Sequence, residues 1–435
     1  MRSTERASVL PFAILLLSAL SAAQAGNAGE QVKNIRTKMR ASRTAGDWRA
    51  NLTAAQEHKA FLNESANSLL EVSRAQVHLG DFHGALKEIE HFAQMGQSID
   101  LLAASSDFAP LVKSPNFAKV QTLLNENQKP VSRASTAFQL ADSNLLSEDI
   151  DYDSAAHRFF ITSVREKKIV AVDDSATGTA ADFAKAPDNW PMLAVKVDRQ
   201  HGRLWATEVA MQGFEIVDKS DWGKSAVLCY DLHSGKLLRR VEGPHGSALG
   251  DMTLMQNGDV IVSDGSGGGV YRLTATGGEL ERIDNGDFIS PQTAAMHPDG
   301  KHIFVPDYLR GIGVLDPATK HVRWLSTEQR FALSGIDGLY FDRGKLIAVQ
   351  NGTSPERVVI FTLDATLSKI DSETVIERST ESLGDPTHGV VIGSDFFYIA
   401  NSGWDITEDN GNLKAGAKAS SPRIMKAPLV SAQHD

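Results

Sequence analysis

The fold is indicated most clearly by one segment in the last third of the chain, Gly335-Ile336-Asp337-Gly338-Leu339-Tyr340-Phe341-Asp342. It has the length and composition of a short β-strand, bounded by glycine and aspartate, the residue types that favour turns. A turn separates it from a second β-segment at residues 345–349, and a third follows at residues 358–361. The segment therefore predicts consecutive antiparallel strands joined by short connections.

The same pattern recurs along the last two thirds of the chain. The six strands begin at Glu148, Leu193, Asp251, Gln292, Asp337 and His388. The steps between these starts are 45, 58, 41, 45 and 51 residues. A period of about 40 to 50 residues, with four strands in each unit, is the signature of a β-propeller. The sequence predicts a mainly β fold, with a six-bladed propeller over residues 137–429.

Closing such a ring requires a partner for the last blade, because an open blade leaves a strand edge unpaired. The third strand of that blade falls at residues 424–426, near the end of the chain. Residues 137–140 form a β-segment just before the first repeat. We expect this early segment to supply the outer strand of blade six.

The first 25 residues have the order of a secretion signal. Arg2 and Arg6 precede an apolar run at residues 9–20, and Ala23-Gln24-Ala25 follows it. This order predicts a cleavable signal peptide over residues 1–25. We expect the mature chain to be periplasmic or secreted and to have no transmembrane segment, because no later apolar run reaches about 18 residues.

Residues 26–130 precede the repeats and are predicted to be helical. From Leu52 to about Glu126 the apolar residues recur at helical spacing, and Gly80-Asp81 breaks the run, with Asp81 as the N-cap of the next helix. Residues 77–86 and 108–111 resemble the last unit of a tetratricopeptide array. The region is then either a helical cap packed on the propeller or a docking surface for a protein partner.

Composition excludes several classes of function. The chain has 44 Lys and Arg residues against 54 Asp and Glu residues, a net charge of -10, without basic runs. Such a surface repels phosphate backbones, so no nucleic-acid partner is expected. Cys229 is the single cysteine, which excludes an internal disulfide and a multi-cysteine zinc site.

The starts of the innermost strands meet at one mouth of a propeller channel. Three of the six starting residues are carboxylates, and Gln292 and His388 add an amide and an imidazole. Carboxylates that face one another repel, and a hard divalent cation with oxygen ligands relieves that repulsion. The sequence predicts a metal site here. The other interpretation is a solvated funnel in which these groups bind water and backbone.

Two further sets of residues are predicted to reach the same face. Long connections in blades two and six carry Phe214, Trp222 and Trp404, which either cover a ligand or pack the loops. The ends of the second strands carry a second polar ring, Glu208, Asp264, Asp307, Asn351 and Asn401. Its members either orient a substrate or form turns.

Residues 335–339 and His297-Pro298-Asp299-Gly300, within this blade series, resemble the six-bladed propellers of the senescence-marker-protein/gluconolactonase family. The resemblance covers roughly residues 138–429. It implies one divalent ion at the mouth, calcium first with zinc or magnesium as alternatives, and hydrolysis of lactones or related esters. By position it implies Glu148, Gln292 and Asp337 as ligands. Gln292 stands where the family has Asn, and Gly250 stands at a second family Asn, with Asp251 beside it as a substitute ligand.

Two classes of function follow. In the first, the chain is a metal-dependent lactone or ester hydrolase, with Asp337 as both ligand and base and Glu148 as the anchoring ligand. His388, three residues after Asp385, is then either a general base or a local hydrogen-bond partner. In the second, the propeller is a non-catalytic ligand- or protein-binding module with a helical docking cap, since propellers support both roles.

Overall fold

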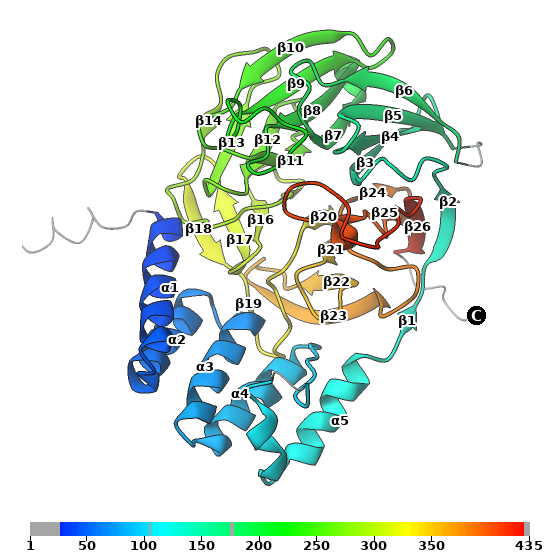
Figure 1. Ribbon diagram of the computed structural model, residues 1–435. Helices are drawn as coiled ribbons and strands as arrows, with labels where there is room; N and C mark the ends of the chain where they lie inside the picture. Colours follow the sequence, from blue (N-terminus) through cyan, green and yellow to red (C-terminus); the bar gives the residue numbers. More distant parts are fainter. Residues whose placement is uncertain (1–26, 104–105, 175–177, 430–435) are drawn as a thin grey trace, which may run out of the picture.

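The six repeats fold into six sheets arranged around one axis (Figure 1). The computed structural model describes residues 27–103, 106–174 and 178–429. The predicted signal peptide, residues 1–25, lies outside the described residues. The prediction of a six-bladed β-propeller preceded by helices is confirmed.

Each blade is an antiparallel sheet whose strands follow one another from the channel outward. Blade one has β3 (Ser147–Asp153), β4 (Arg158–Ser163), β5 (Lys168–Asp173) and β6 (Ala180–Lys185). Blade two has β7 (Met192–Asp198), β8 (Arg203–Val209), β9 (Ser225–Asp231) and β10 (Leu237–Glu242), with the short helix η2 (Arg199–His201) between the first two. Blade three has β11 (Leu249–Leu254), β12 (Val260–Asp264), β13 (Gly269–Leu273) and β14 (Glu281–Arg282).

The remaining blades vary this plan. Blade four has β15 (Ala295–Met296), β16 (Ile303–Asp307), β17 (Gly311–Asp316) and β18 (His321–Trp324). Blade five has β20 (Gly338–Asp342), β21 (Lys345–Gln350), β22 (Arg357–Leu363) and β23 (Lys369–Arg378), and β1 (Val131–Ser132) and β19 (Ser326–Thr327) pair with its outer strand. Blade six has β24 (Gly389–Ile392), β25 (Asp395–Ile399) and β26 (Arg423–Pro428), with η3 (Trp404–Ile406) in the connection before β26.

The ring closes as predicted. Strand β2 (Ser135–Gln139) pairs antiparallel with β26, with Phe138 opposite Ile424, and forms the outer strand of blade six. The innermost strands also touch in a closed series, β3 to β7, β11, β15, β20, β24 and back to β3. Residues from both ends of the propeller therefore share one blade, and the six strand starts surround one channel.

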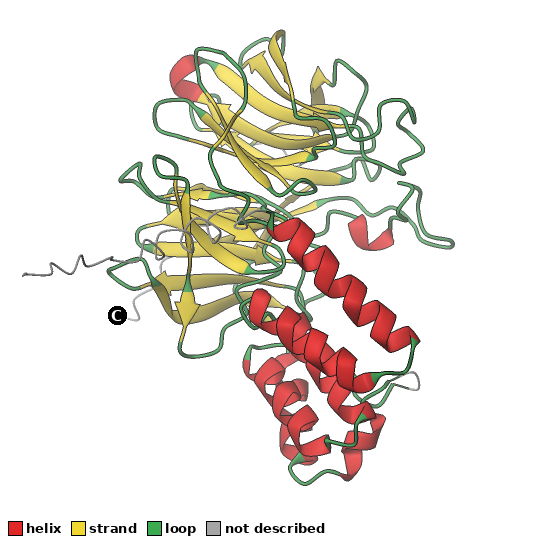
Figure 2. Ribbon diagram, turned by 90° about the vertical axis from the view of Figure 1, so that its left-hand side faces the viewer, coloured by secondary structure: helices red, strands yellow, loops and turns green. Residues whose placement is uncertain are grey.

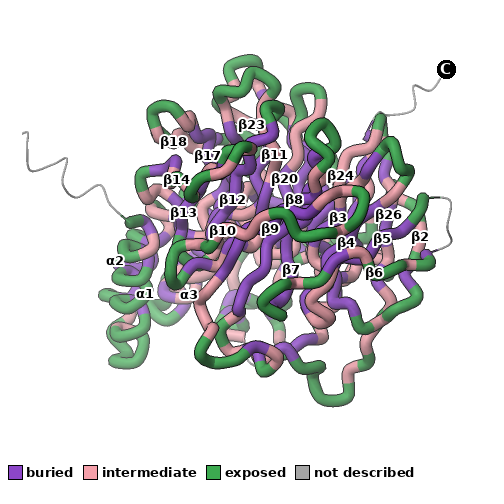
Figure 3. Tube along the Cα trace, turned by 90° about the horizontal axis from the view of Figure 1, so that it is seen from above, coloured by how far each residue is buried: buried purple, intermediate pink, exposed green. Residues whose placement is uncertain are grey.

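The core lies between the blades. Strand β12 is buried along its whole length, because both faces of its sheet pack against neighbouring sheets. Figure 3 shows buried chain through the strands and exposed chain at the turns. The apolar contacts between blades fix the direction of each inner strand and hence the position of its first residue.

The first part of the described chain is helical. It contains α1 (Ala28–Thr44), α2 (Trp48–Phe61), α3 (Ala66–His78), α4 (Phe82–Gln94), the short helix η1 (Ala109–Lys113) and α5 (Phe117–Asn127). Asp81 caps α4 as predicted, since its carboxylate accepts a hydrogen bond from the amide of Gly84 at 2.9 Å. Among the described helices, none combines the length and the apolar character needed to span a membrane.

The helices gather on one side of the propeller (Figure 2). The core of α3, α4 and α5 includes Ala332, from the connection that leads into blade five. The backbone amide of Ala28 at the start of α1 donates to the carbonyl of Gly286 at 2.9 Å. Strand β1 then continues directly from α5 into blade five. The helical region is thus packed on the propeller along blades three to five.

Candidate functional site

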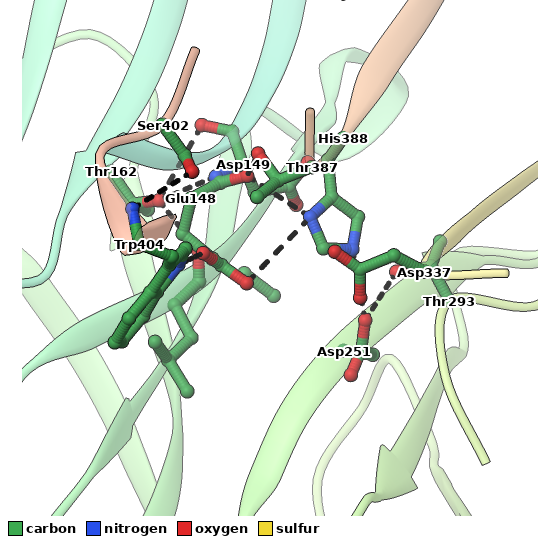
Figure 4. Close-up of polar contacts among 12 residues, drawn as sticks. Glu148, Asp149, Thr162, Asp251, Thr293, Asp337, Thr387, His388, Ser402 and Trp404 are labelled. Atoms are coloured by element: carbon green, nitrogen blue, oxygen red, sulfur yellow. Dashed lines mark hydrogen bonds and ion pairs between the residues drawn. The ribbon is translucent and has the colours of Figure 1, made fainter. Parts of the chain in front are cut away.

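The innermost strands contact one another around the ring, and three of the six predicted strand starts come close together. Ligand atoms of Glu148, Asp337 and His388 lie within 4.8 Å of one another. Figure 4 shows Glu148 and Asp337 converging from strands of blades one and five, with His388 between them. Residues 189 positions apart in the sequence therefore share one cluster because the ring closes.

The cluster opens into a cavity of about 360 Å³, which we call the mouth cavity. It is lined by Glu148, Ser290, Gln292, Tyr308, Asp337, Asn351, Asp385 and Trp404. Of the four predicted ligands, three line it, and the fourth, Asp251, does not. Three of the lining side chains are carboxylates, and nearly all the others are polar, so the cavity suits a charged or strongly polar occupant.

Glu148 is held from one side by the connection of blade six. The indole Nε1 of Trp404, on η3, donates a hydrogen bond to Oε2 of Glu148. Its other oxygen, Oε1, lies 4.0 Å from Nδ1 of His388. Burial and the nearby carboxylate of Asp337 raise the pKa of Glu148 well above its usual range. The site therefore favours the neutral acid unless a positive charge compensates it.

Asp337 is held by a chain of hydrogen bonds. The side-chain amide of Asn351 donates to Oδ2 of Asp337 at 2.9 Å, and the hydroxyl of Tyr308 donates to Oδ1 of Asn351 at 3.0 Å. This fixes one carboxylate oxygen and leaves Oδ1 without a hydrogen bond among the described residues. Burial raises the pKa of Asp337, and Asp251 adds to the effect.

Gln292 and Asp385 complete the oxygen donors. The amide nitrogen of Gln292 donates to the carbonyl and the hydroxyl of Ser290, at 3.3 and 3.1 Å, which leaves its Oε1 as the free end of the amide. Burial and the neighbouring Glu356 raise the pKa of Asp385 to about 7. Four oxygen-bearing side chains thus face one small volume.

His388 and Asp251 lie below this layer and bind each other. His388 is 2% exposed, its Nε2 lies 2.9 Å from Oδ1 of Asp251, and its Nδ1 lies 3.0 Å from the carbonyl oxygen of Glu148. Both partners are acceptors, so both ring nitrogens donate. Although burial opposes it, the carboxylates of Asp337 and Asp251 raise the pKa of His388 well above its usual value.

This arrangement bears on the predicted roles of His388 as a general base and of Asp251 as a metal ligand. An imidazolium that donates from both nitrogens has no lone pair for a metal or a proton, so the geometry favours the hydrogen-bond partner over the general base for His388. Asp251 is also bound by the hydroxyl of Thr293 at 2.7 Å, and it faces His388 rather than the mouth cavity. The two form a charged pair that supports the layer above.

A second buried pair was not predicted. Asp149, the residue after Glu148, accepts hydrogen bonds from the ammonium group of Lys196 and the amide of Val195. Asp149 is 1% exposed and Lys196 is 8% exposed. A signal was present in the sequence, since both are charged residues within inner-strand segments, where burial demands a partner.

The aromatic residues of the two long connections divide between the two predicted roles, packing the loop and reaching the cavity. Phe214 is buried in an apolar cluster with Leu193, the starting residue of blade two, so it packs the loop. Trp222 borders the same cluster, and Trp404 packs against Phe214 while its indole reaches Glu148. Of the three aromatic residues, Trp404 is the one that lines the mouth cavity.

The residues at the ends of the second strands, which the sequence predicted as a second polar ring, also have different roles. Asn351 positions Asp337 at the cavity. Asp264 and Asp307 instead accept hydrogen bonds from several backbone amides and stabilise turns, which is the second of the two predicted roles. Glu208 pairs with Arg240, and Asn401 binds the chain before β26. Ser290 and Tyr308 were missed; Tyr308 directly follows the second strand of blade four, as Asn351 does in blade five, so its position was a usable signal.

The donor set fits a divalent cation. Within the described residues, Oε1 of Glu148, Oδ1 of Asp337 and Oε1 of Gln292 form no hydrogen bond to protein, although all three residues line the mouth cavity. Carboxylate and amide oxygens are the ligands that calcium and magnesium prefer. Three carboxylates with raised pKa values in one cavity are also the electrostatic pattern that a cation relieves.

The fold and site together define a six-bladed propeller with a cavity lined by three carboxylates. No family model and no curated protein matches the chain. Among solved structures, a gluconolactonase from Xanthomonas campestris is similar at 16% identity and a TM-score of 0.46, over 68% of this chain and 89% of that one.

Two other solved structures are similar to a comparable degree. Regucalcin, a calcium-binding protein from Agrobacterium tumefaciens, has 14% identity and a TM-score of 0.45, over 67% of this chain and 93% of that one. The PQQ-bound aldose sugar dehydrogenase of Streptomyces coelicolor has 12% identity and a TM-score of 0.46, over 68% and 99%. These values assign no activity to the chain, so its function is argued from the site.

Proposed function

We propose that the protein is a metal-dependent hydrolase of lactones or related esters that acts at the mouth cavity. The observation that carries the proposal is the pair of opposed carboxylates, Glu148 and Asp337, beside the free amide oxygen of Gln292. The family resemblance of the blade series supports the substrate class. We propose calcium as the ion, with zinc or magnesium as alternatives, because the donors are oxygen atoms.

The side chains would divide the work as follows. A bound divalent cation supplies Lewis acidity toward a carbonyl oxygen. Asp337 accepts a proton from the attacking water at Oδ1, while Asn351 keeps Oδ2 in place. The water oxygen bonds to the carbonyl carbon, the ring C–O bond breaks, and Asp337 returns the proton to the leaving alkoxide, which gives a hydroxy acid.

The rest of the site positions these groups. Trp404 fixes Glu148 as the anchoring ligand, and its ring borders the cavity where the organic part of a substrate would lie. His388 holds the backbone of Glu148 from below and places a positive charge under the carboxylates. In this proposal His388 is a positioning residue rather than the base.

The location of the protein is part of the proposal. The basic, apolar and small-residue order of residues 1–25 supports export to the periplasm or the medium. Cell fractionation with the first 25 residues present and removed tests it. Export that is independent of these residues would contradict this part without affecting the chemistry at the mouth.

Asp337→Asn is the first test of the hydrolase. We expect hydrolysis of a lactone panel, followed as acid release, to fall by about 100-fold or more, because a positioned base contributes about 10²- to 10⁴-fold. Asp342→Asn is the matched control, since Asp342 ends the same strand, β20, and pairs with Arg343 on the surface. Equal loss in both variants, or no loss in Asp337→Asn, would refute the assignment.

The alternative is a non-catalytic binding propeller. One observation favours it: neither nitrogen of His388 is free to accept a proton, so the proton acceptors at the mouth are the same carboxylates that would hold the ion. Calorimetric metal titration alongside the lactone panel separates the two. Metal binding that Glu148→Gln weakens, without turnover of any lactone or ester, selects the binding module. A protein partner captured through residues 26–130 would further support docking.

A further inference from the structure

A second cluster of ligand-type side chains lies in the β15–β16 turn of blade four. Ligand atoms of His297, Asp299 and His302 lie within 4.8 Å of one another. Gln292 lies at the mouth cavity, and the chain then runs through β15 to this turn at the other end of the strand. The cluster is therefore separate from the candidate site described above.

The backbone of the turn holds the cluster in place. The amide of His297 donates to the carbonyl of His302 at 3.0 Å, and the amide of Gly300 donates to the carbonyl of His297 at 3.1 Å. Gly300 has a φ of +67°, a conformation that suits glycine. Such a doubly closed turn restricts how far the three side chains can move apart.

Asp299 is aimed at both histidines. Its Oδ1 accepts the amides of Lys301 and His302 at 2.8 and 3.1 Å, which leaves Oδ2 for the imidazoles. Oδ2 lies 3.0 Å from Nδ1 of His297 and 2.7 Å from Nδ1 of His302. Although partial burial opposes it, these hydrogen bonds hold the pKa of Asp299 well below its usual value, so the carboxylate is charged.

The rings are oriented by packing. His297 lies edge-on to Phe341 at 5.0 Å and to Phe304 at 6.2 Å, and the plane of His302 is turned 84° from that of His297. The side chains of His297 and His302 are 23% and 35% exposed, so water and ions reach them. Two imidazoles and one carboxylate thus present donor atoms at one accessible point.

We infer that His297, Asp299 and His302 form a binding site for a divalent transition ion such as Zn²⁺. Tetrahedral ligands about 2.0 Å from zinc lie about 3.3 Å apart, so small movements of the 2.7 and 3.0 Å contacts place an ion between them. Imidazole donors favour zinc, copper or nickel over calcium. Three protein ligands leave a fourth position open to water or an exogenous group.

The two sites therefore differ in donor chemistry, and this makes them separable. The mouth cavity offers oxygen atoms, whereas the turn offers two nitrogens and one oxygen. Co²⁺ replaces zinc and gives intense visible bands in a four-coordinate, nitrogen-containing site, but only weak bands in an octahedral oxygen site. The visible spectrum thus reports the turn site in the presence of the mouth site.

The experiment titrates Co²⁺ and then Zn²⁺ into the full chain. We expect intense visible bands that zinc abolishes, that are lost in His302→Gln, and that persist in Glu148→Gln. The matched control is His321→Gln, since His321 is an exposed histidine of the same blade, on β18. Intense bands that remain in His302→Gln, or that are absent from the wild type, would overturn the inference.

A second measurement guards against a folding defect in the variant. X-ray absorption at the zinc edge on the wild-type protein, loaded with one equivalent of zinc, should show two imidazole ligands. A shell of oxygen atoms alone would overturn the inference and leave Asp299 as a hydrogen-bond partner of His302, with its own backbone amide donating to Nδ1 of His297 at 3.3 Å. Metal-free thermal unfolding of His302→Gln should match that of His321→Gln.

Discussion

At the scale of single residues, the mouth arranges its charges in two layers. Glu148 and Asp337 face the cavity, and the pair of His388 and Asp251 lies beneath them. A buried charge is costly unless it is paired, and the lower layer is paired within the protein. The upper layer lacks a comparable partner, which is the physical reason for expecting an external cation.

Metal affinity should therefore depend on pH. The pKa values of Glu148 and Asp337 are raised in the folded protein. At a pH where the carboxyl groups of the unfolded chain have already lost their protons, the metal-free folded protein therefore still keeps protons on these two residues. Its stability accordingly falls as pH rises, and metal binding must release protons. We expect calcium affinity to rise from about pH 5 to about pH 8, the range above the ordinary carboxylate pKa values.

Calorimetry in buffers of different ionisation enthalpy measures that proton release. Wild-type protein should release protons on binding calcium near neutral pH, and Glu148→Gln should bind more weakly and release fewer. Asp342→Asn is the control, because Asp342 pairs with Arg343 and lines neither proposed metal site. Calcium binding without proton release, equal in wild type and Glu148→Gln, would show that these carboxylates do not hold the ion.

The structure places Glu148, Gln292 and Asp337 at the cavity, whereas Asp251, the fourth predicted ligand, lies outside its lining. Strand β11 changes register between Leu249 and Asp251, and β3 does so between Ser147 and Ile150. An irregularity of this kind re-aims one side chain, and residue types alone do not reveal it. The sequence also could not predict that Asp251 pairs with His388, 137 residues away, because this contact depends on the change of register in β11.

At the scale of elements, the local sequence pattern predicted the strands and their pairing better than it predicted the side-chain contacts of the site. The strand starts and the closing strand follow from period and turn chemistry, and β2 pairs with β26 as expected. Helix α1 falls inside the predicted helical region, but the helical spacing was traced only from Leu52, although Val32, Ile35 and Met39 recur on the buried face of α1. Its mean hydropathy is low, and its buried side chains meet α2 and a residue of the distant propeller, Ile289, which the local sequence does not show.

The pairing of β2 with β26 should contribute measurably to the free energy of unfolding. Leu140, directly after β2, is 1% exposed and packs with Ile399 and Ile424 of blade six. We expect Leu140→Ala to lower the free energy of unfolding by about 2 to 5 kcal/mol, because the change leaves a cavity in the closing contact. Leu238→Ala is the matched control, since Leu238 on β10 is 54% exposed. Denaturant unfolding that is equal for the two variants would contradict this closure.

At the scale of the whole molecule, a buried arginine joins the helices to the propeller. Arg357 on β22 is fully buried, its Nε donates to Oε1 of Gln350 at 2.8 Å, and its Nη1 donates to the carbonyl of Met95, after α4, at 3.4 Å. Glu373 lies 3.3 Å from Nη2. The helical region therefore shares a buried charge network with blade five, and we expect both parts to unfold together.

Scanning calorimetry tests this coupling. Wild-type protein should give one transition, whereas Arg357→Ala should lose about 3 kcal/mol or more of stability and separate the helical transition from that of the propeller, because Glu373 loses its buried partner. Arg343→Ala removes an exposed ion pair with Asp342 and should cost about 1 kcal/mol or less. Two separate transitions in the wild type would show that the network does not couple the parts.

We propose above that Glu148 and Asp337 hold a divalent cation in the mouth cavity. The most direct measurement is an anomalous difference map from crystals of the protein grown with Mn²⁺, which takes the same oxygen ligands as calcium. We expect one peak in the mouth cavity, bound by a carboxylate oxygen from each residue and by Oε1 of Gln292. A map with no peak there, from crystals in which both carboxylates are ordered, would contradict it.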